Sequence, residues 1–284
     1  MSEDSTNCKH EGCRFKAIVL TEFCWFHLQE KDHYRGDLEL RAEMGYDFSS
    51  ANFARAQLDN IRLPGAKLSD ADFSGARLHS ADFSGADLAG AELRGCDLRF
   101  ANLSRLQGSG ARFECAFLAE CNLEYAQLAD ANLTHTDLRG AKFAGASLFR
   151  ARLDFAVLEG ADLRTADLSF AVVGGAHAST ANFNEADLSR SNLVGTDLEE
   201  ASLVGANLFY ARPGRARLRR ANLTKARLER TILREADLTG ATLKGAVLKG
   251  AVLERAVLVG VNLSGVSLKD ANTTDVVFDR EEEK

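Results

Sequence analysis

Three cysteines and one histidine near the N-terminus are the side chains of this sequence best suited to hold a metal ion. Cys8, Cys13, Cys24 and His27 form a C-x4-C-x10-C-x2-H arrangement. Thiolate and imidazole ligands paired at the two ends of a short loop suit tetrahedral zinc. Four protein ligands leave no open coordination position, so a zinc ion here would be structural rather than catalytic. We therefore predict one structural zinc ion at this cluster.

Neighbouring histidines leave the ligand set open. His10 could replace one of the four ligands, and His33 is a weaker candidate. The segment resembles a zinc knuckle, and it is too short to bury a core of its own, which favours a metal staple. Free, partly buried cysteines are the alternative. A knuckle that binds RNA is a further alternative, which the excess of acidic over basic side chains in residues 1–45 disfavours.

A short knot and a helix must position these ligands. Residues 28–44 are charged, carry leucines at helical spacing and predict a helix that ends near Gly45. Four aromatic residues are expected to pack around the metal: Phe15, Phe23, Trp25 and Phe26. The other cysteines form no second site, because Cys96 and Cys121 stand where small inward-facing residues are expected.

The rest of the chain follows a five-residue period. From Phe48 to Phe278, every fifth residue is leucine or phenylalanine, usually with alanine two residues earlier. The exceptions are Gly108, Val173, Ala178, Pro213 and Thr273. On an α-helix, a five-residue step rotates the side chain by about 140°, and on a flat strand it alternates faces. A chain that turns a corner every five residues instead points all these side chains inward.

Units such as residues 71–75 (Ala-Asp-Phe-Ser-Gly) and 161–165 (Ala-Asp-Leu-Arg-Thr) resemble the pentapeptide repeat family. The resemblance implies an all-β fold, the right-handed quadrilateral β-helix, with four pentapeptides per coil and nearly twelve coils here. We expect three segments: 1–45, the Cys/His metal-binding knot and capping helix; 46–278, the β-helix; 279–284, a charged tail. The helix would cover the first coil, because an open β-helix end exposes unpaired strand edges.

The pattern also indicates where the corners lie and where the repeat is interrupted. Most of the 23 glycines stand two residues after an inward-facing leucine or phenylalanine, where a corner needs a positive φ. Gly108, Ala178 and Pro213 interrupt the inward ladder, either as tolerated defects or as loops used for recognition.

One vertical file of side chains predicts a binding surface. Stacking at twenty residues per coil would align Arg150, Phe170, Arg190, Tyr210 and Arg230 along one edge. Alternating arginines and aromatic rings favour cation–π contacts, and exposed side chains of these types are common interface anchors. We predict that this edge binds a protein partner. The alternative is a stack that only stabilises the rod.

Charge is uneven along the rod. Residues 212–256 carry twelve basic and four acidic side chains, a basic belt that is either solvated or binds an acidic partner, a phosphate or nucleic acid. His79, His135 and His177 are scattered over the repeats and indicate no catalytic site. We therefore expect a non-enzymatic scaffold or adaptor, with nucleic acid an unlikely partner.

The family resemblance implies an alternative function, a DNA mimic that binds DNA gyrase and protects it from fluoroquinolones. The basic belt would interrupt the continuous acidic surface that such a mimic needs. The N-terminus lacks the features of a signal peptide, and no apolar run is long enough for a membrane helix. We therefore expect a cytoplasmic protein without membrane contact, whose cysteines are reduced or bound to metal.

Overall fold

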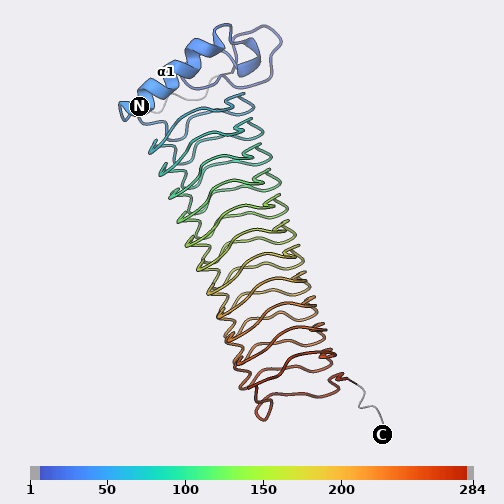
Figure 1. Cartoon of the computed structure of the whole chain (residues 1–284). Coiled ribbons are helices and arrows are strands. Elements are labelled where there is room, and N and C mark those ends of the chain that lie inside the picture. Colours follow the sequence, from blue (N-terminus) through green and yellow to red (C-terminus); the bar gives the residue numbers. More distant parts are fainter. Residues whose placement is uncertain (1–6, 280–284) are drawn as a thin grey trace.

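In the computed structural model, which describes residues 7–279, the chain forms a long rod with a small cap over its N-terminal end (Figure 1). Isolated parallel β-bridges join most outward residues to the one twenty positions later, from Asp47 with Lys67 to Val257 with Val277. Because the chain turns a corner every five residues, each twenty-residue coil has four sides. The corners confirm the prediction from the five-residue period, and the four sides agree with what the family resemblance implies.

Each five-residue unit points two side chains inward. In the unit 161–165, Ala161 and Leu163 are fully buried, whereas Arg164 is exposed. The same alternation continues along the rod and builds one continuous core of alanine with leucine or phenylalanine. Cys96 and Cys121 occupy inward positions and are fully buried, as the sequence predicts.

The corner residue of each unit has a left-handed backbone. Gly75 has a φ of 65°, but Phe170 and Arg190 adopt the same conformation, with φ values of 60° and 59°. Left-handed backbone costs a residue with a side chain roughly 1–2 kcal/mol. Glycine therefore marks many corners without being required at them, and side-chain contacts at other corners must offset this cost.

Gly108 interrupts the inward ladder without forming a loop. Its N–H donates to the carbonyl of Gln127 at 2.8 Å, so the register of the coil is kept. A Cβ at Gly108 would lie 3.0 Å from Leu128 Cδ2 and 3.2 Å from Leu106 Cδ2. Leu106 stands at the position that alanine usually occupies, so the large and small inward residues of this unit are exchanged. The interruption is a swap of sizes that keeps the core filled.

The two other interruptions also stay in register. The N–H of Ala178 donates to the carbonyl of Asp197 at 2.7 Å. Pro213 has no N–H to donate, and the bridge that would pair Arg212 with Ile232 is missing among residues 7–279. The N–H of Ile232 still donates to Ala211 at 2.9 Å, so the proline removes one bridge and leaves the coil in place.

The cap contains the 3-10 helix η1 (Trp25–His27) and the helix α1 (Lys31–Glu43). The predicted helix begins later than expected, because Leu28 is extended. It ends as predicted: Gly45 has a φ of 76°, its N–H donates to Ala42, and the N–H of Tyr46 donates to Arg41, both at 2.9 Å. This is a Schellman C-cap. Within residues 7–279, no helix is long and apolar enough to cross a membrane.

Helix α1 closes the N-terminal end of the core. Tyr34, Leu38 and Ala42 lie on one face of the helix at four-residue spacing and are buried in the same apolar cluster as the coils. Leu38 is fully buried, which contributes about 1.5–3 kcal/mol. The cap also pairs backbone groups of the first coil: Glu39 Oε1 accepts the N–H of Arg62 at 2.9 Å.

Candidate metal centre and partner-binding edge

Two of the predicted metal ligands lie at the neck of a small hairpin. Asn7 and Lys16 form an antiparallel bridge, and the N–H of Cys8 donates to the carbonyl of Phe15 at 2.9 Å. The chain then turns through Gly12, which has a φ of 76°, and the N–H of Cys13 donates to His10 at 3.1 Å. The hairpin thereby turns both thiols toward the same point.

The other two ligands are held by the 3-10 turn. Cys24 directly precedes η1, and the N–H of His27 donates to the carbonyl of Cys24 at 3.0 Å. Residues three apart in a 3-10 turn project from the same side. The short spacing between Cys24 and His27 thus places the thiol and the imidazole side by side.

The four ligand atoms of Cys8, Cys13, Cys24 and His27 lie within 4.8 Å of one another. Cys13 Sγ and Cys24 Sγ are 3.7 Å apart, and His27 Nδ1 lies 3.4 Å from Cys8 Sγ and 3.3 Å from Cys24 Sγ. Zinc bond lengths of about 2.3 Å to sulfur and about 2.0 Å to nitrogen give tetrahedral edges of roughly 3.5–3.8 Å. This cluster has the donors and the spacing to hold a metal ion.

His10 lies outside this group of four. Its ring stacks on the ring of His27, with centroids 3.7 Å apart and planes 5° from parallel. His10 therefore supports the orientation of the ligand ring, and His33, exposed on α1, is also outside the group. The expected aromatic packing is only partly correct. Trp25 is buried, whereas the three phenylalanines are exposed: Phe15, Phe23 and Phe26.

The surroundings of Cys8 favour the charged thiolate. Burial raises the pKa of this thiol, but backbone N–H groups at Cys24 and His10, with the side chains of His27 and Cys13, outweigh it and lower the pKa to about 6. A thiolate is the form that binds metal. The surroundings of Cys8 therefore favour the form that binds metal.

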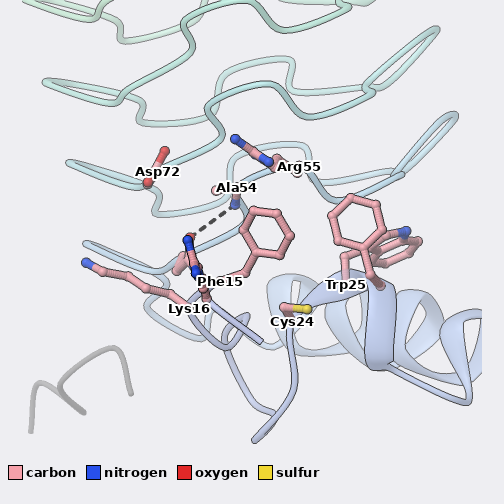
Figure 2. A pocket seen from close by; sticks show the side chains of 10 residues that line it. Phe15, Lys16, Cys24, Trp25, Ala54, Arg55 and Asp72 are labelled. Atoms are coloured by element: carbon pink, nitrogen blue, oxygen red, sulfur yellow. Dashed lines mark hydrogen bonds between the residues drawn. The ribbon is translucent and has the colours of Figure 1, made fainter. Parts of the chain in front are cut away.

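A seam joins the knot to the first coils (Figure 2). The Arg55 guanidinium lies 4.6 Å from the centroid of the Phe15 ring, and Asn52 Nδ2 donates to the carbonyl of Ala17 at 2.6 Å. A small pocket remains between the knot and the coils, with Trp25 on its wall. Sequence reasoning missed these contacts, because no period links residues 15–17 to residues 52–55.

The predicted edge file forms a stack over four of its five residues. The Arg190 guanidinium lies between two rings, 5.3 Å from the centroid of Phe170 and 5.9 Å from that of Tyr210. Arg230 covers the other side of Tyr210 at 5.3 Å and donates to its hydroxyl. The twenty-residue register thus brings Phe170, Arg190, Tyr210 and Arg230 together as expected.

Arg150, the fifth residue of the file, differs from the expected alternation. Its Nε pairs with Asp130 Oδ1 at 3.0 Å. Phe170 packs edge-on against Phe149 instead, with centroids 5.7 Å apart. An open hollow lies beside these rings, lined by Phe149, Phe170 and Val172 and by three charged side chains: Asp130, Arg150 and Arg152.

Carboxylates pair with much of the basic belt. Seven of its twelve basic side chains lie within 4 Å of an acidic oxygen: Arg215, Arg217, Arg219, Arg220, Arg227, Arg234 and Arg255. Arg217 and Arg220 reach back to Glu199 in the preceding acidic stretch, at 2.9 Å and 2.8 Å. Exposed pairs add little stability, but they neutralise much of the positive charge of the belt.

Known proteins with this repeat match the chain. The family model described as pentapeptide repeats matches residues 47–212 and 214–272. HetL, a pentapeptide repeat protein involved in heterocyst differentiation regulation in the cyanobacterium Nostoc sp. strain PCC 7120, is 33% identical; the alignment covers 81% of this chain and 96% of HetL, with a TM-score of 0.45.

Two further solved structures are more distant. QnrB1, a plasmid-mediated fluoroquinolone resistance protein, is 18% identical over 66% of this chain and 94% of its own, with a TM-score of 0.32. A pentapeptide repeat protein from the Arabidopsis thaliana thylakoid lumen is 27% identical over 51% of this chain and 70% of its own, with a TM-score of 0.21. No curated protein matches the sequence significantly.

The assignment rests on the repeat itself, because the family model covers most of the chain. The five-residue period, the twenty-residue ladder and the inward alanine–leucine pairs agree with this assignment. The chain belongs to the pentapeptide repeat family, whose members fold as right-handed quadrilateral β-helices.

Proposed function

We propose that this protein is a non-enzymatic, cytoplasmic scaffold, and that the edge formed by Arg150, Phe170, Arg190, Tyr210 and Arg230 binds a protein partner. The observation that supports this most is the position of Arg190 between two rings that remain 46% and 38% exposed, those of Phe170 and Tyr210. Arginine and aromatic side chains dominate binding hot spots. The β-helix holds them rigid, so little conformational entropy is lost on binding.

Two other functions have less support. A DNA mimic that binds DNA gyrase needs a continuous acidic surface, and the edge carries three arginines instead. Nucleic-acid or phosphate binding through the belt needs unpaired cations, but most of the belt arginines are paired with carboxylates. Charge distribution thus favours the scaffold over both.

The Cys/His cluster has a separate role in this proposal. A zinc ion held by Cys8, Cys13, Cys24 and His27 would be structural and would keep the knot folded against the first coil. The tetrahedral spacing of the four ligand atoms supports zinc, and the seam contacts of Phe15 with Arg55 would pass the rigidity of the knot to the rod.

Affinity capture from native lysate, followed by mass spectrometry, identifies a partner protein. Its affinity for variants of the edge is then measured. Replacing Phe170 and Tyr210 together with serine should weaken binding of that partner at least tenfold, about 1.4 kcal/mol. Phe100 and Tyr125, which are 55% and 56% exposed on other corners, provide the matched control. Replacing them with serine should leave affinity unchanged. Wild-type affinity in the Phe170/Tyr210 double variant would reject the edge as the binding surface.

A further inference from the structure

The edge separates two faces of different charge. On one side, the outward residues include Asp167 and Asp187. On the other side, the outward ladder contains no acidic residue over five successive coils. We call this ladder the acid-free face: Arg152, Val172, Asn192, Arg212 and Ile232.

Three cations around the acid-free face have no carboxylate partner within residues 7–279. Arg190 lies against the rings of Phe170 and Tyr210, Arg230 against the ring and hydroxyl of Tyr210, and Arg212 is exposed on the face itself. Arg150 and Arg152, nearer the hollow, are instead paired with Asp130 and Asp154 at 3.0 Å and 3.7 Å. Uncompensated positive charge is therefore concentrated at one end of the face.

The acid-free face is also flat and partly apolar. Val194 and Ile232 are 45% and 37% exposed on or beside it. At Gly214, which bounds it, φ is not positive and an added Cβ would find its nearest neighbour, the carbonyl oxygen of Arg234, at 3.5 Å. Neither backbone conformation nor lack of space requires glycine there. The missing side chain leaves the surface open.

We propose that the acid-free face binds an acidic, extended segment of a partner protein, with an apolar side chain seated against Phe149, Phe170 and Val172 in the hollow, whose other lining residues are Asp130, Arg150 and Arg152. This inference rests on the proposed scaffold function and specifies the chemistry of its partner. Carboxylates of the segment pair with Arg190, Arg212 and Arg230. The apolar residue packs against the two rings and Val172 at the other end of the face.

Spacing along the rod sets the spacing in the partner. Val172 and Arg212 are two coils apart, about 10 Å at the separation of neighbouring strands. An extended chain covers this distance in about three residues. The partner segment should therefore carry its acidic residues about three positions from a large apolar residue.

The mixture of charge and apolar surface favours a peptide over a nucleic acid. Single-stranded nucleic acids need a continuous basic groove along the backbone together with stacking platforms. Here the three unpaired arginines lie among the exposed side chains of Tyr210 and Ile232. On the side of the face bounded by Gly214, Val194 is also exposed and apolar. An acidic peptide with one apolar anchor matches both parts of this surface.

A random peptide library displayed on phage, panned against the full chain, tests the chemistry directly. Peptides that prefer wild type over the Arg212→Glu and Gly214→Glu variants should carry clustered aspartate or glutamate about three residues from an aromatic or aliphatic residue. Circular dichroism checks that both variants stay folded. Absence of such peptides, or enrichment without an acidic cluster, would overturn the proposal.

Fluorescence anisotropy of the best enriched peptide then gives its affinity for matched variants. Arg212→Glu should weaken binding at least tenfold, whereas Lys225→Glu, the same charge reversal at a cation on another corner, should change it less than twofold. Equal losses in the two variants, or displacement of the peptide by a poly-dT oligonucleotide, would overturn the proposal. If the captured partner loses affinity for the Phe170/Tyr210 double variant but not for Arg212→Glu, the scaffold function stands and this inference fails.

Discussion

The two ends of the β-helix solve the same physical problem in different ways. At the N-terminal end, Phe48 is 1% exposed beneath the cap, and Leu38 of α1 completes the apolar cluster. At the C-terminal end, Leu263 and Leu268 hold the same inward positions but are only partly buried. A stacked coil buries its core only when something covers it, and of the two end coils within residues 7–279 only the first is covered.

Backbone pairing follows the same division. The cap supplies partners to the first coil, since Glu39 accepts the N–H of Arg62 and Val19 donates to the carbonyl of Asn52, both at 2.9 Å. In the last coil, the N–H groups of Leu268 and Thr273 have no acceptor among residues 7–279. Solvent must satisfy groups that the cap satisfies at the other end.

Register also weakens toward the C-terminus. The bridge that would join Val247 to Ser267 is missing from the described chain, and the N–H of Gly250 donates to Asp270, one residue later than the repeat requires. Figure 1 shows a small loop bulging from this last coil. A coil of this β-helix therefore keeps its geometry where a neighbour lies on both sides, and its register loosens where one side is open.

The largest expected effect comes from removing the metal. Cys13→Ala should abolish stoichiometric zinc, measured by elemental analysis, because three protein ligands remain at a site that needs four. The knot should then unfold, and backbone hydrogen exchange in residues 47–72 should accelerate at least tenfold. Coils near residue 250 should keep wild-type protection, because each coil contacts only its neighbours.

Cys115 supplies the control for this experiment. It is exposed at a distant corner, so Cys115→Ala should retain zinc and leave exchange unchanged. If wild-type protein purified without added metal contains no zinc, the cap is not stabilised by a bound zinc ion. Faster exchange at both ends of the rod would contradict the local role of the knot.

A smaller effect separates covered from uncovered leucines. Leu163→Ala, at a fully buried position, should lower the free energy of unfolding by about 2–5 kcal/mol, because it leaves a cavity between two coils. Leu263→Ala should cost about 1 kcal/mol or less, because that side chain is already partly exposed and water can fill the space. Urea denaturation followed by circular dichroism measures both.

Arg164→Ala is the surface control for the leucine pair. Its side chain is exposed and pairs with Asp162 at 2.7 Å, so its loss should change stability by no more than about 0.5 kcal/mol. Comparable losses for Leu163→Ala and Leu263→Ala would mean that the C-terminal end is as well covered as the middle.

The sequence predicted most where a period carried the information. The spacing of Leu163 and its counterparts predicted a corner every five residues, because only inward-pointing corners place every fifth residue in one core, and the family resemblance implied four such sides per coil. Stacking at twenty residues also predicted the contacts of Arg190 with Phe170 and Tyr210. The spacing of Cys24 and His27 located two metal ligands, because a short turn fixes their relative position.

Contacts that follow no period could not be predicted from the sequence. Nothing in the pattern indicates that Arg150 turns toward Asp130, because the register places it beside Asp130 and Phe170 alike and side-chain geometry decides between them. The exchange of sizes at Leu106 and Gly108 was also hidden, since it requires knowing that both side chains share one space. The same holds for the seam between the cap and the rod.

The smallest effect sharpens the comparison of the ends within a single file of the rod. Asn52 and Asn272 occupy equivalent outward positions, eleven coils apart in the register, and the Oδ1 of each accepts the N–H two residues later, Ala54 at 3.1 Å and Thr274 at 3.0 Å. Only Asn52 is buried, and only its Nδ2 reaches the cap, where it donates to the carbonyl of Ala17 at 2.6 Å.

Asn52→Ala should therefore lower stability by about 1–2 kcal/mol, because it removes a buried hydrogen bond and leaves the Ala17 carbonyl without its donor. Asn272→Ala removes the same local turn contact at an exposed site, and should cost about 0.5 kcal/mol or less. Asn272 Oδ1 also accepts the hydroxyl of Thr274 at 2.7 Å, which Ala54 cannot supply, so the difference in thermal unfolding between the two variants gives a lower limit for the bond to the cap. If the two variants are equally stable, that bond adds no more than the exposed Thr274 contact, and the cap is held mainly by its other contacts, which include α1, the Phe15–Arg55 contact and the Val19 N–H bond to Asn52.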